Sequence, residues 1–135
     1  MVEAAYDAAL TSWEGPDPDL LRNAPADPIL AQRDTNLANY LWDGERVRIV
    51  GFEDAAISHP ADELALMIEH ISALELDADD IVDRFTVDPS RLLAARRVWA
   101  MFWLRLLLPG GRAATRNPPG ASDRQARRLL TLLDP

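Results

Sequence analysis

At 135 residues the chain has the length of one ordinary domain, and we expect a single domain over residues 1–135. Its net charge of −8 argues against nucleic acid and anionic membrane surfaces as partners, because both attract dense positive charge. The absence of cysteine excludes disulfides, thiolate metal sites and cysteine nucleophiles, and the acidic N-terminus is unlike a signal peptide, so we expect a cytoplasmic protein.

The first half of the chain is predicted to contain one helix, one arm and one hairpin. Apolar side chains recur at helical spacing near the N-terminus: Val2, Tyr6, Ala9, Leu10 and Trp13. Residues 14–30 contain four prolines and are predicted to form a connecting arm that need not be ordered along its length. Two β-prone runs, 40–42 and 47–50, flank a turn at Asp43-Gly44-Glu45 and predict a β-hairpin.

The second half is predicted to be helical. One helix begins at Pro60, a short one follows Asp77, and a long one over about 90–108 begins after the N-cap Asp88. The long helix is apolar nearly all round, so we expect it at the centre of a bundle, with the rings of Trp99, Phe102 and Trp103 in the core. Ser122 and Gln125 are predicted to form a capping box for a last helix. The fold class is therefore α+β, predominantly helical, with one small hairpin.

One segment has residues at a spacing that suits phosphoryl transfer. Residues 32–44 have the sequence Gln-Arg-Asp-Thr-Asn-Leu-Ala-Asn-Tyr-Leu-Trp-Asp-Gly, and residues 50–55 have Val-Gly-Phe-Glu-Asp-Ala. Asp34 precedes Asn39 by five positions, so a carboxylate that can accept a proton from a hydroxyl lies near an amide oxygen that can bind magnesium. These segments, with Pro60-Ala61-Asp62-Glu63-Leu64-Ala65, resemble the aminoglycoside phosphotransferase and choline-kinase-like family.

The resemblance implies a fold and a set of roles. It covers the C-terminal lobe of the protein-kinase-like fold, in which the small hairpin carries the catalytic loop. It implies that Asp34 is the ancestral catalytic base, that Asn39 is a magnesium ligand, and that Leu41 lies beneath the adenine ring. ATP and Mg²⁺ are the implied cofactors, and the implied partner is a small hydroxyl acceptor such as an aminoglycoside, choline or a sugar.

The sequence also departs from the family pattern. Gly51 stands where the family has its metal-binding Asp, and Gln32-Arg33 stands where the aminoglycoside enzymes have His-Gly. All fourteen basic residues are Arg, so the chain has no Lys to contact phosphates, and no N-terminal nucleotide-binding lobe precedes Asp34. We therefore expect weak or absent binding of ATP and Mg²⁺, and a truncated relative of these phosphotransferases that is inactive or severely impaired.

Other interpretations of these residues stay open. Asn39 could instead hold the loop through a hydrogen bond, and Glu53 and Asp54 are expected to be surface or structural residues. His59, in a loop, and His70, placed in the middle of a helix, are not expected to bind metal, because they lack a second ligand at suitable spacing.

Two further functions are compatible with the sequence. The chain could be a non-catalytic protein-binding or assembly module, in which a second copy or a partner chain covers the surface that the absent lobe would cover. It could also be half of a split kinase that another chain completes in trans.

Overall fold

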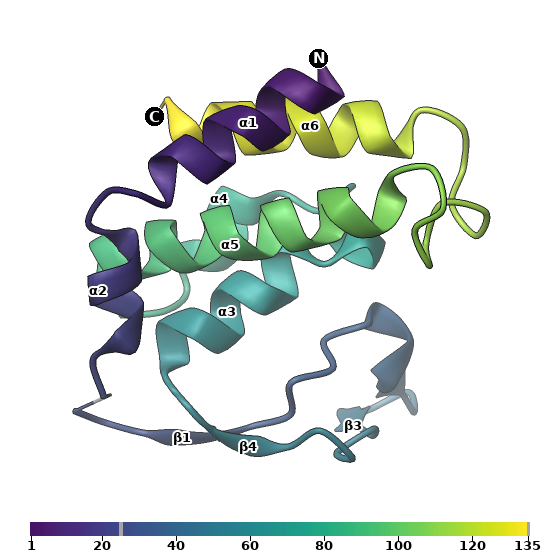
Figure 1. Ribbon diagram of the computed structural model, residues 1–135. Helices are drawn as coiled ribbons and strands as arrows, with labels where there is room; N and C mark the ends of the chain where they lie inside the picture. The colour runs from purple at the N-terminus through teal and green to yellow at the C-terminus, as the bar shows by residue number, and fades with distance from the viewer. Residues whose placement is uncertain (25, 135) are drawn as a thin grey trace.

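The computed structural model describes residues 1–24 and 26–134, which form a predominantly helical α+β structure (Figure 1). The helices in these residues are α1 (Val2–Ser12), α2 (Asp17–Arg22), α3 (Pro60–Glu69), α4 (Ala78–Val82), α5 (Pro89–Leu107) and α6 (Ala121–Leu133). Two antiparallel sheets pair β1 (Ile29–Ala31) with β4 (Ala56–Ser58), and β2 (Tyr40–Trp42) with β3 (Val47–Ile49). Two 3-10 turns, η1 (Leu37–Asn39) and η2 (Ile71–Ala73), complete the description. The predicted fold class is confirmed at this level.

Helix α5 lies at the centre of the molecule, as predicted. Figure 1 shows α1 and α6 side by side on one side of α5, α3 on the other side, and the strands beyond α3. Small residues such as Ala100 of α5 and Ala126 of α6, both fully buried, allow α1, α5 and α6 to approach closely. A second apolar cluster joins α3 to α5 through buried residues that include Leu64, Ile68 and Leu92.

The proline-rich arm is more ordered than the sequence suggests, because α2 forms inside it. Two arginines of α5 fix this helix. Arg91 donates hydrogen bonds to carbonyls at the end of α2, and Arg97 binds the buried carboxylate of Asp17 at its start, with an N–O distance of 3.1 Å. The expectation of a loop is wrong for Asp17–Arg22 because these partners lie about 70 to 80 residues further along the chain.

A buried ion triad fixes the end of α3. The carboxylate of Glu69 is fully buried and accepts hydrogen bonds from Arg96 on α5 at 2.7 Å and from Arg128 on α6 at 2.5 Å. A buried charge is tolerated only when it is paired. The triad therefore joins α3, α5 and α6.

Two other sequence predictions are wrong. The sequence predicted one hairpin, whereas β1 and β4 also pair, with Ile29 opposite Ser58. Ser122 and Gln125 do not form a capping box. Helix α6 follows Gly120, and Gln125 is fully buried with its Nε2 donating to the carbonyl of Ala100 at 3.0 Å, so it cannot reach back to the helix start.

The hairpin and two of the predicted caps are confirmed. Strands β2 and β3 pair around the turn at Asp43. The carboxylate of Asp88 accepts from the backbone N–H of Arg91 at 2.8 Å, and that of Asp77 caps α4. None of the helices in residues 1–24 and 26–134 has the length and apolar character that crossing a bilayer requires.

Candidate functional site

The loop that follows β1 is held at its start by α3 and by the chain after the hairpin. The buried amide of Gln32 donates to the carbonyl of Val50, and the backbone N–H of Arg33 donates to Oε1 of Glu63 at 3.1 Å. Arg33 has a φ of 65°, a left-handed conformation that favours glycine. These contacts turn the chain sharply and leave the side chain of Asp34 exposed.

Asn39 holds the other end of this loop against Asp34. Its Nδ2 donates to the backbone carbonyl of Asp34 at 2.9 Å, while Oδ1 of Asp34 accepts the backbone N–H of Asn36 at 3.4 Å. The backbone N–H of Leu37 donates to the hydroxyl of Ser72 at 3.0 Å. The structural role that the sequence allowed for Asn39 is thus present, and the loop is tied to the segment after α3.

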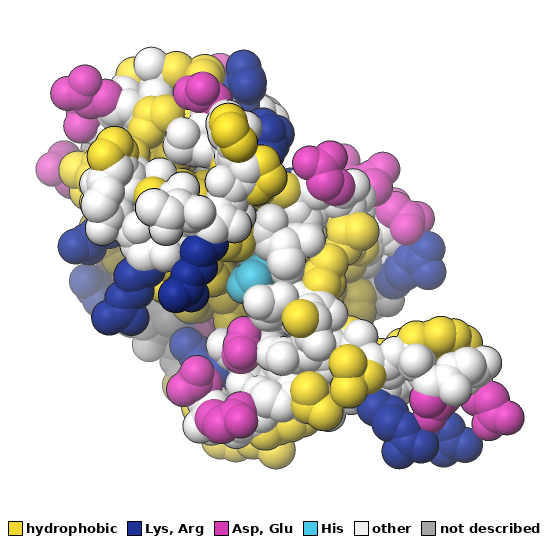
Figure 2. Space-filling view, turned by 90° about the vertical axis from the view of Figure 1, so that its right-hand side faces the viewer, with side chains coloured by type: hydrophobic (Ala, Val, Ile, Leu, Met, Phe, Trp, Pro, Cys, Tyr) yellow, Lys and Arg dark blue, Asp and Glu magenta, His cyan; other side chains and the backbone are white. Residues whose placement is uncertain are grey.

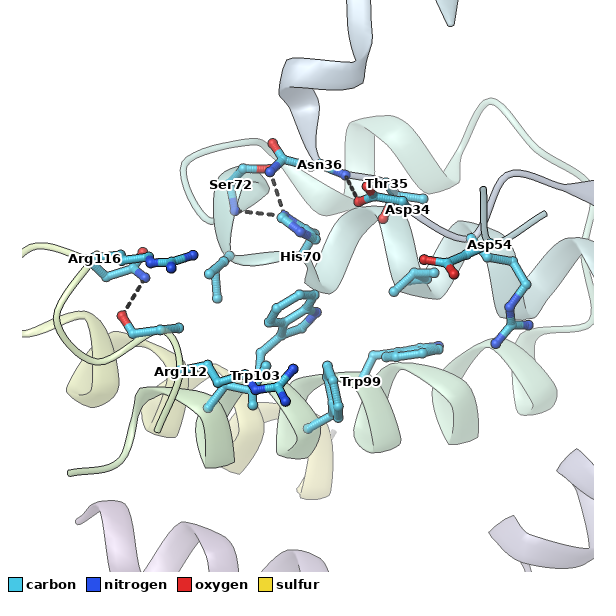
Figure 3. A pocket seen from close by; sticks show the side chains of 17 residues that line it. Asp34, Thr35, Asn36, Asp54, His70, Ser72, Trp99, Trp103, Arg112 and Arg116 are labelled. Atoms are coloured by element: carbon cyan, nitrogen blue, oxygen red, sulfur yellow. Dashed lines mark hydrogen bonds between the residues drawn. The ribbon is translucent and has the colours of Figure 1, made fainter. Parts of the chain in front are cut away.

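A pocket of about 860 Å³ opens beside Asp34 (Figure 3). One wall consists of residues 33–36 and Asp54, and a second consists of residues 70–72, which follow α3. Helix α5 forms the floor, and the loop between α5 and α6 forms the remaining wall with Arg112 and Arg116. Figure 2 shows the hollow, with basic and acidic side chains around its edge. A volume of this size is typical of small-molecule sites.

The floor of the pocket is aromatic, which corrects the sequence prediction for α5. The rings of Phe102 and Trp103 meet edge to face with centroids 5.1 Å apart, and those of Trp99 and Phe102 at 5.5 Å. All three line the pocket, and Phe102 is 42% exposed, so they are not simply core residues. Trp99 also packs against the cluster between α3 and α5. The apolar face of α5 that no other helix covers forms this floor.

His70 is a pocket residue that the sequence analysis missed. It lies just after α3 rather than in the middle of a helix, because α3 ends at Glu69. Its Nδ1 accepts the backbone N–H of Ser72 at 3.0 Å and lies 2.7 Å from the hydroxyl of that residue, so the proton of the neutral ring is on Nε2. Burial lowers the pKa of His70, although the nearby Asp34 acts in the opposite direction. We therefore treat the ring as neutral at neutral pH. The sequence carried no signal for this position, because the apolar spacing of the predicted helix continues through Ile71 and Leu74.

The charges around the pocket are partly separated, with Arg33 next to Asp34 and two more arginines in the loop between α5 and α6. In Figure 3, Asp34 and Asp54 lie to the right of His70, Arg116 lies to its left, and Arg112 lies below Trp103. Among the residues that the structure describes, neither Arg112 nor Arg116 is within ion-pair distance of a carboxylate. Glu53 and Asp54 are both exposed, as expected of surface residues, and Asp54 also lines the pocket.

The positions that the resemblance assigns to nucleotide and metal lie outside this pocket. Leu41 is 48% exposed on β2, opposite Arg48 of β3. Gly51 has a φ of 77°, and a Cβ placed on it would lie 2.9 Å from Nδ2 of Asn39. The structure therefore brings Asp34, Asn39 and Gly51 together and leaves Leu41 on the open face of the hairpin.

Residues 1–24 and 26–134 contain no group of three or more His, Asp or Glu side chains arranged to hold a metal ion. His59 instead caps α3, with Nδ1 accepting the backbone N–H of Ala61 at 3.1 Å. Comparison of the chain with known protein families, with curated proteins and with solved structures found no match.

Proposed function

We propose that this chain is the acceptor-binding, C-lobe-like part of a small-molecule phosphotransferase fold, with Asp34 as its ancestral base and with nucleotide and metal sites too incomplete for efficient transfer. The observation that carries the proposal is the exposed carboxylate of Asp34 at the edge of a pocket of about 860 Å³. A hydroxyl of a bound molecule could reach that carboxylate, as a general base requires.

The backbone around Asp34 supports the resemblance. Arg33 adopts a left-handed conformation at the position where the aminoglycoside enzymes have glycine. Positions 39 and 51, which the resemblance assigns to the two magnesium ligands, are in direct contact, since a Cβ at Gly51 would touch the amide of Asn39. Asn39 and Gly51 are therefore close enough for side chains at the two positions to bind one ion.

The chemistry of the same positions argues against efficient catalysis. Gly51 offers no side-chain oxygen, and the chain has no Lys to contact a phosphate group. Among the described residues, those before Asp34 form α1, α2 and β1 rather than a β-rich lobe with a glycine-rich loop. We therefore expect at most weak binding of ATP and Mg²⁺.

Phosphoryl transfer is tested by incubating the chain with ATP, Mg²⁺ and a panel of aminoglycosides, choline and sugars. The expected result is no phosphorylation above background, together with no magnesium-dependent binding of ATP in calorimetry. Robust turnover that disappears in Asp34→Ala would support Asp34 as the base and contradict the proposed incompleteness.

The assignment of the metal positions is tested by introducing the missing carboxylate. Gly51→Asp should create binding of Mn²⁺, seen as paramagnetic broadening of amide signals at residues 34 and 39. Gly44→Asp, in the exposed hairpin turn, is the matched control and should broaden neither signal. A folded Gly51→Asp variant without localised broadening would contradict the assignment.

A second candidate function is a non-catalytic assembly module, and the exposed apolar strands favour it. Leu30 of β1 and Ile57 of β4 are paired across the sheet and are both 69% exposed. On the hairpin, Trp42 is 66% and its partner Val47 is 55% exposed. Exposed apolar side chains that gather in patches mark association surfaces. A β-rich lobe supplied in trans would cover the same strands.

Light scattering after size exclusion tests self-association through these strands. The second candidate predicts a concentration-dependent dimer that Trp42→Lys or Ile57→Lys disrupts. A strict monomer at every concentration would exclude a second copy as the occupant of this face.

A further inference from the structure

The charge of the pocket differs in sign from that of the whole chain. The chain carries a net charge of −8, yet the pocket is lined by three arginines and two aspartates. The arginines are Arg33, Arg112 and Arg116, and the aspartates are Asp34 and Asp54. His70 adds no charge at neutral pH, since its Nδ1 accepts rather than donates. In an acidic protein, such a local excess of positive charge favours an anionic ligand.

Arg112 and Arg116 are exposed residues at the pocket and differ from the arginines that are bound inside the fold. Within the fold, Arg91 is bound to the partly buried carboxylate of Asp62, and Arg96 and Arg128 are bound to the buried carboxylate of Glu69. By contrast, Arg112 and Arg116 come from the loop between α5 and α6 and have no carboxylate partner in the described part of the chain. Two guanidinium groups on one wall can bind a carboxylate through charge-assisted hydrogen bonds.

The two ends of the pocket and its floor suit one kind of molecule. Figure 3 shows Arg116 to the left of His70 and Arg112 below Trp103, with Asp54 at the right and Asp34 above it. The rings of Trp99, Phe102 and Trp103 lie between the two charged sides. Flat or apolar groups stack on such rings, and an alcohol donates well to a free carboxylate.

We propose that the pocket binds a hydroxylated organic anion, with its anionic group on Arg112 and Arg116, its body over Trp103 and Phe102, and its hydroxyl directed to Asp34. This names the acceptor class for the site, and only the hydroxyl end rests on the proposed function. The cationic acceptors that the family resemblance suggested, aminoglycosides and choline, are disfavoured by the two arginines.

Three probes that share a hydroxyphenyl ring and a three-carbon chain test the charge preference. They are 3-(4-hydroxyphenyl)propanoate, the neutral 3-(4-hydroxyphenyl)propan-1-ol and the cationic 3-(4-hydroxyphenyl)propylamine. Titrations followed by the indole N–H signal of Trp103 should show the anion binding about fivefold more tightly than the alcohol, and the amine no more tightly than the alcohol. An amine that binds as tightly as the anion, or no binding of any probe at millimolar concentration, would overturn the proposal.

Two double variants locate the effect. Arg112→Gln with Arg116→Gln should remove the advantage of the anion and leave binding of the alcohol unchanged. Arg124→Gln with Arg127→Gln changes the net charge equally on exposed positions of α6 outside the pocket and should preserve the advantage. If both double variants lose the preference for the anion equally, the preference comes from the net charge of the protein, and the assignment to Arg112 and Arg116 is wrong.

The hydroxyl end is tested separately, without nucleotide. Relative to 3-phenylpropanoate, the hydroxylated anion should bind more tightly to the wild type, and this difference should shrink in Asp34→Ala. If the anion preference persists while this difference is absent, the proposed role of Asp34 fails and the anion site stands. If the preference itself is absent, the anion site fails whatever Asp34 does.

Discussion

Arg91 gives the sharpest test of how the arm is held. Its side chain is 9% exposed and makes two hydrogen bonds to the carboxylate of Asp62, at 3.0 and 2.9 Å. It also donates to the carbonyls of Leu20, Leu21 and Asn23 at 2.7, 3.2 and 3.0 Å. Arg91→Ala would leave all four acceptors without this partner. Breaking such a pair costs about 3–5 kcal/mol, and we expect about 3 because Asp62 keeps some contact with water.

Urea denaturation measures this loss, and hydrogen exchange locates it. A cost of about 3 kcal/mol is a large fraction of the 5–15 kcal/mol that usually separates folded and unfolded states. The amides of α2 should lose protection first, since Arg91 holds the end of that helix. The matched control is Arg84→Ala, which removes an ion pair to Asp80 whose side chains are 70% and 65% exposed and should cost about 0.3–0.5 kcal/mol. Equal costs for the two variants, or unchanged protection of α2, would refute the reasoning.

Three further predictions concern buried or strained positions. Burial lowers the pKa of His70, so at pH values just below about 6.5 the unfolded chain binds more protons than the folded chain. The free energy of unfolding should therefore fall as the pH drops from about 7.5 to about 5.5. Urea midpoints measure this fall, which should be smaller in His70→Gln. Gly51→Ala should cost about 1–2 kcal/mol of stability, because Gly51 has a φ of 77° and the added Cβ would touch Asn39. Gly110→Ala should cost less, since Gly110 has a similar φ of 82° but a Cβ there would meet no atom within 4 Å. Equal costs in denaturation would show that the contact with Asn39 contributes nothing. Glu69→Ala should cost about 3–5 kcal/mol, because it leaves two arginines without their buried carboxylate, and thermal unfolding with an unchanged midpoint would contradict this.

The elements that the sequence predicted correctly are those set by local signals. Asp88 before Pro89 marks the start of α5, and Asp77 marks that of α4, because each side chain caps the backbone a few residues away. The hairpin is set by the turn at Asp43, whose carboxylate accepts backbone N–H groups two and three residues later. Asn39 makes the hydrogen bond to the loop backbone that the sequence left open as one of its two roles.

The elements that the sequence missed depend on partners far along the chain. Strands β1 and β4 have three residues each, too few to show an alternating pattern, and they are joined only when Ile29 meets Ser58. Helix α2 needs arginines of α5. The pocket could not be predicted from the sequence either. The apolar residues of α5 have the same spacing whether they face another helix or an open cavity.

The two halves of the candidate site are unequally developed. On the proposed acceptor side, Asp34, the aromatic floor and two arginines without carboxylate partners surround one cavity in the described structure. On the side that the resemblance assigns to nucleotide, Gly51 lacks a side-chain oxygen, Asn39 holds the loop, and Leu41 is exposed. Binding of an acceptor should therefore not require nucleotide, unlike a site that a nucleotide must complete first. Acceptor affinities measured with and without ATP and Mg²⁺ should be equal, and a clear increase with nucleotide would mean that the two halves are coupled after all.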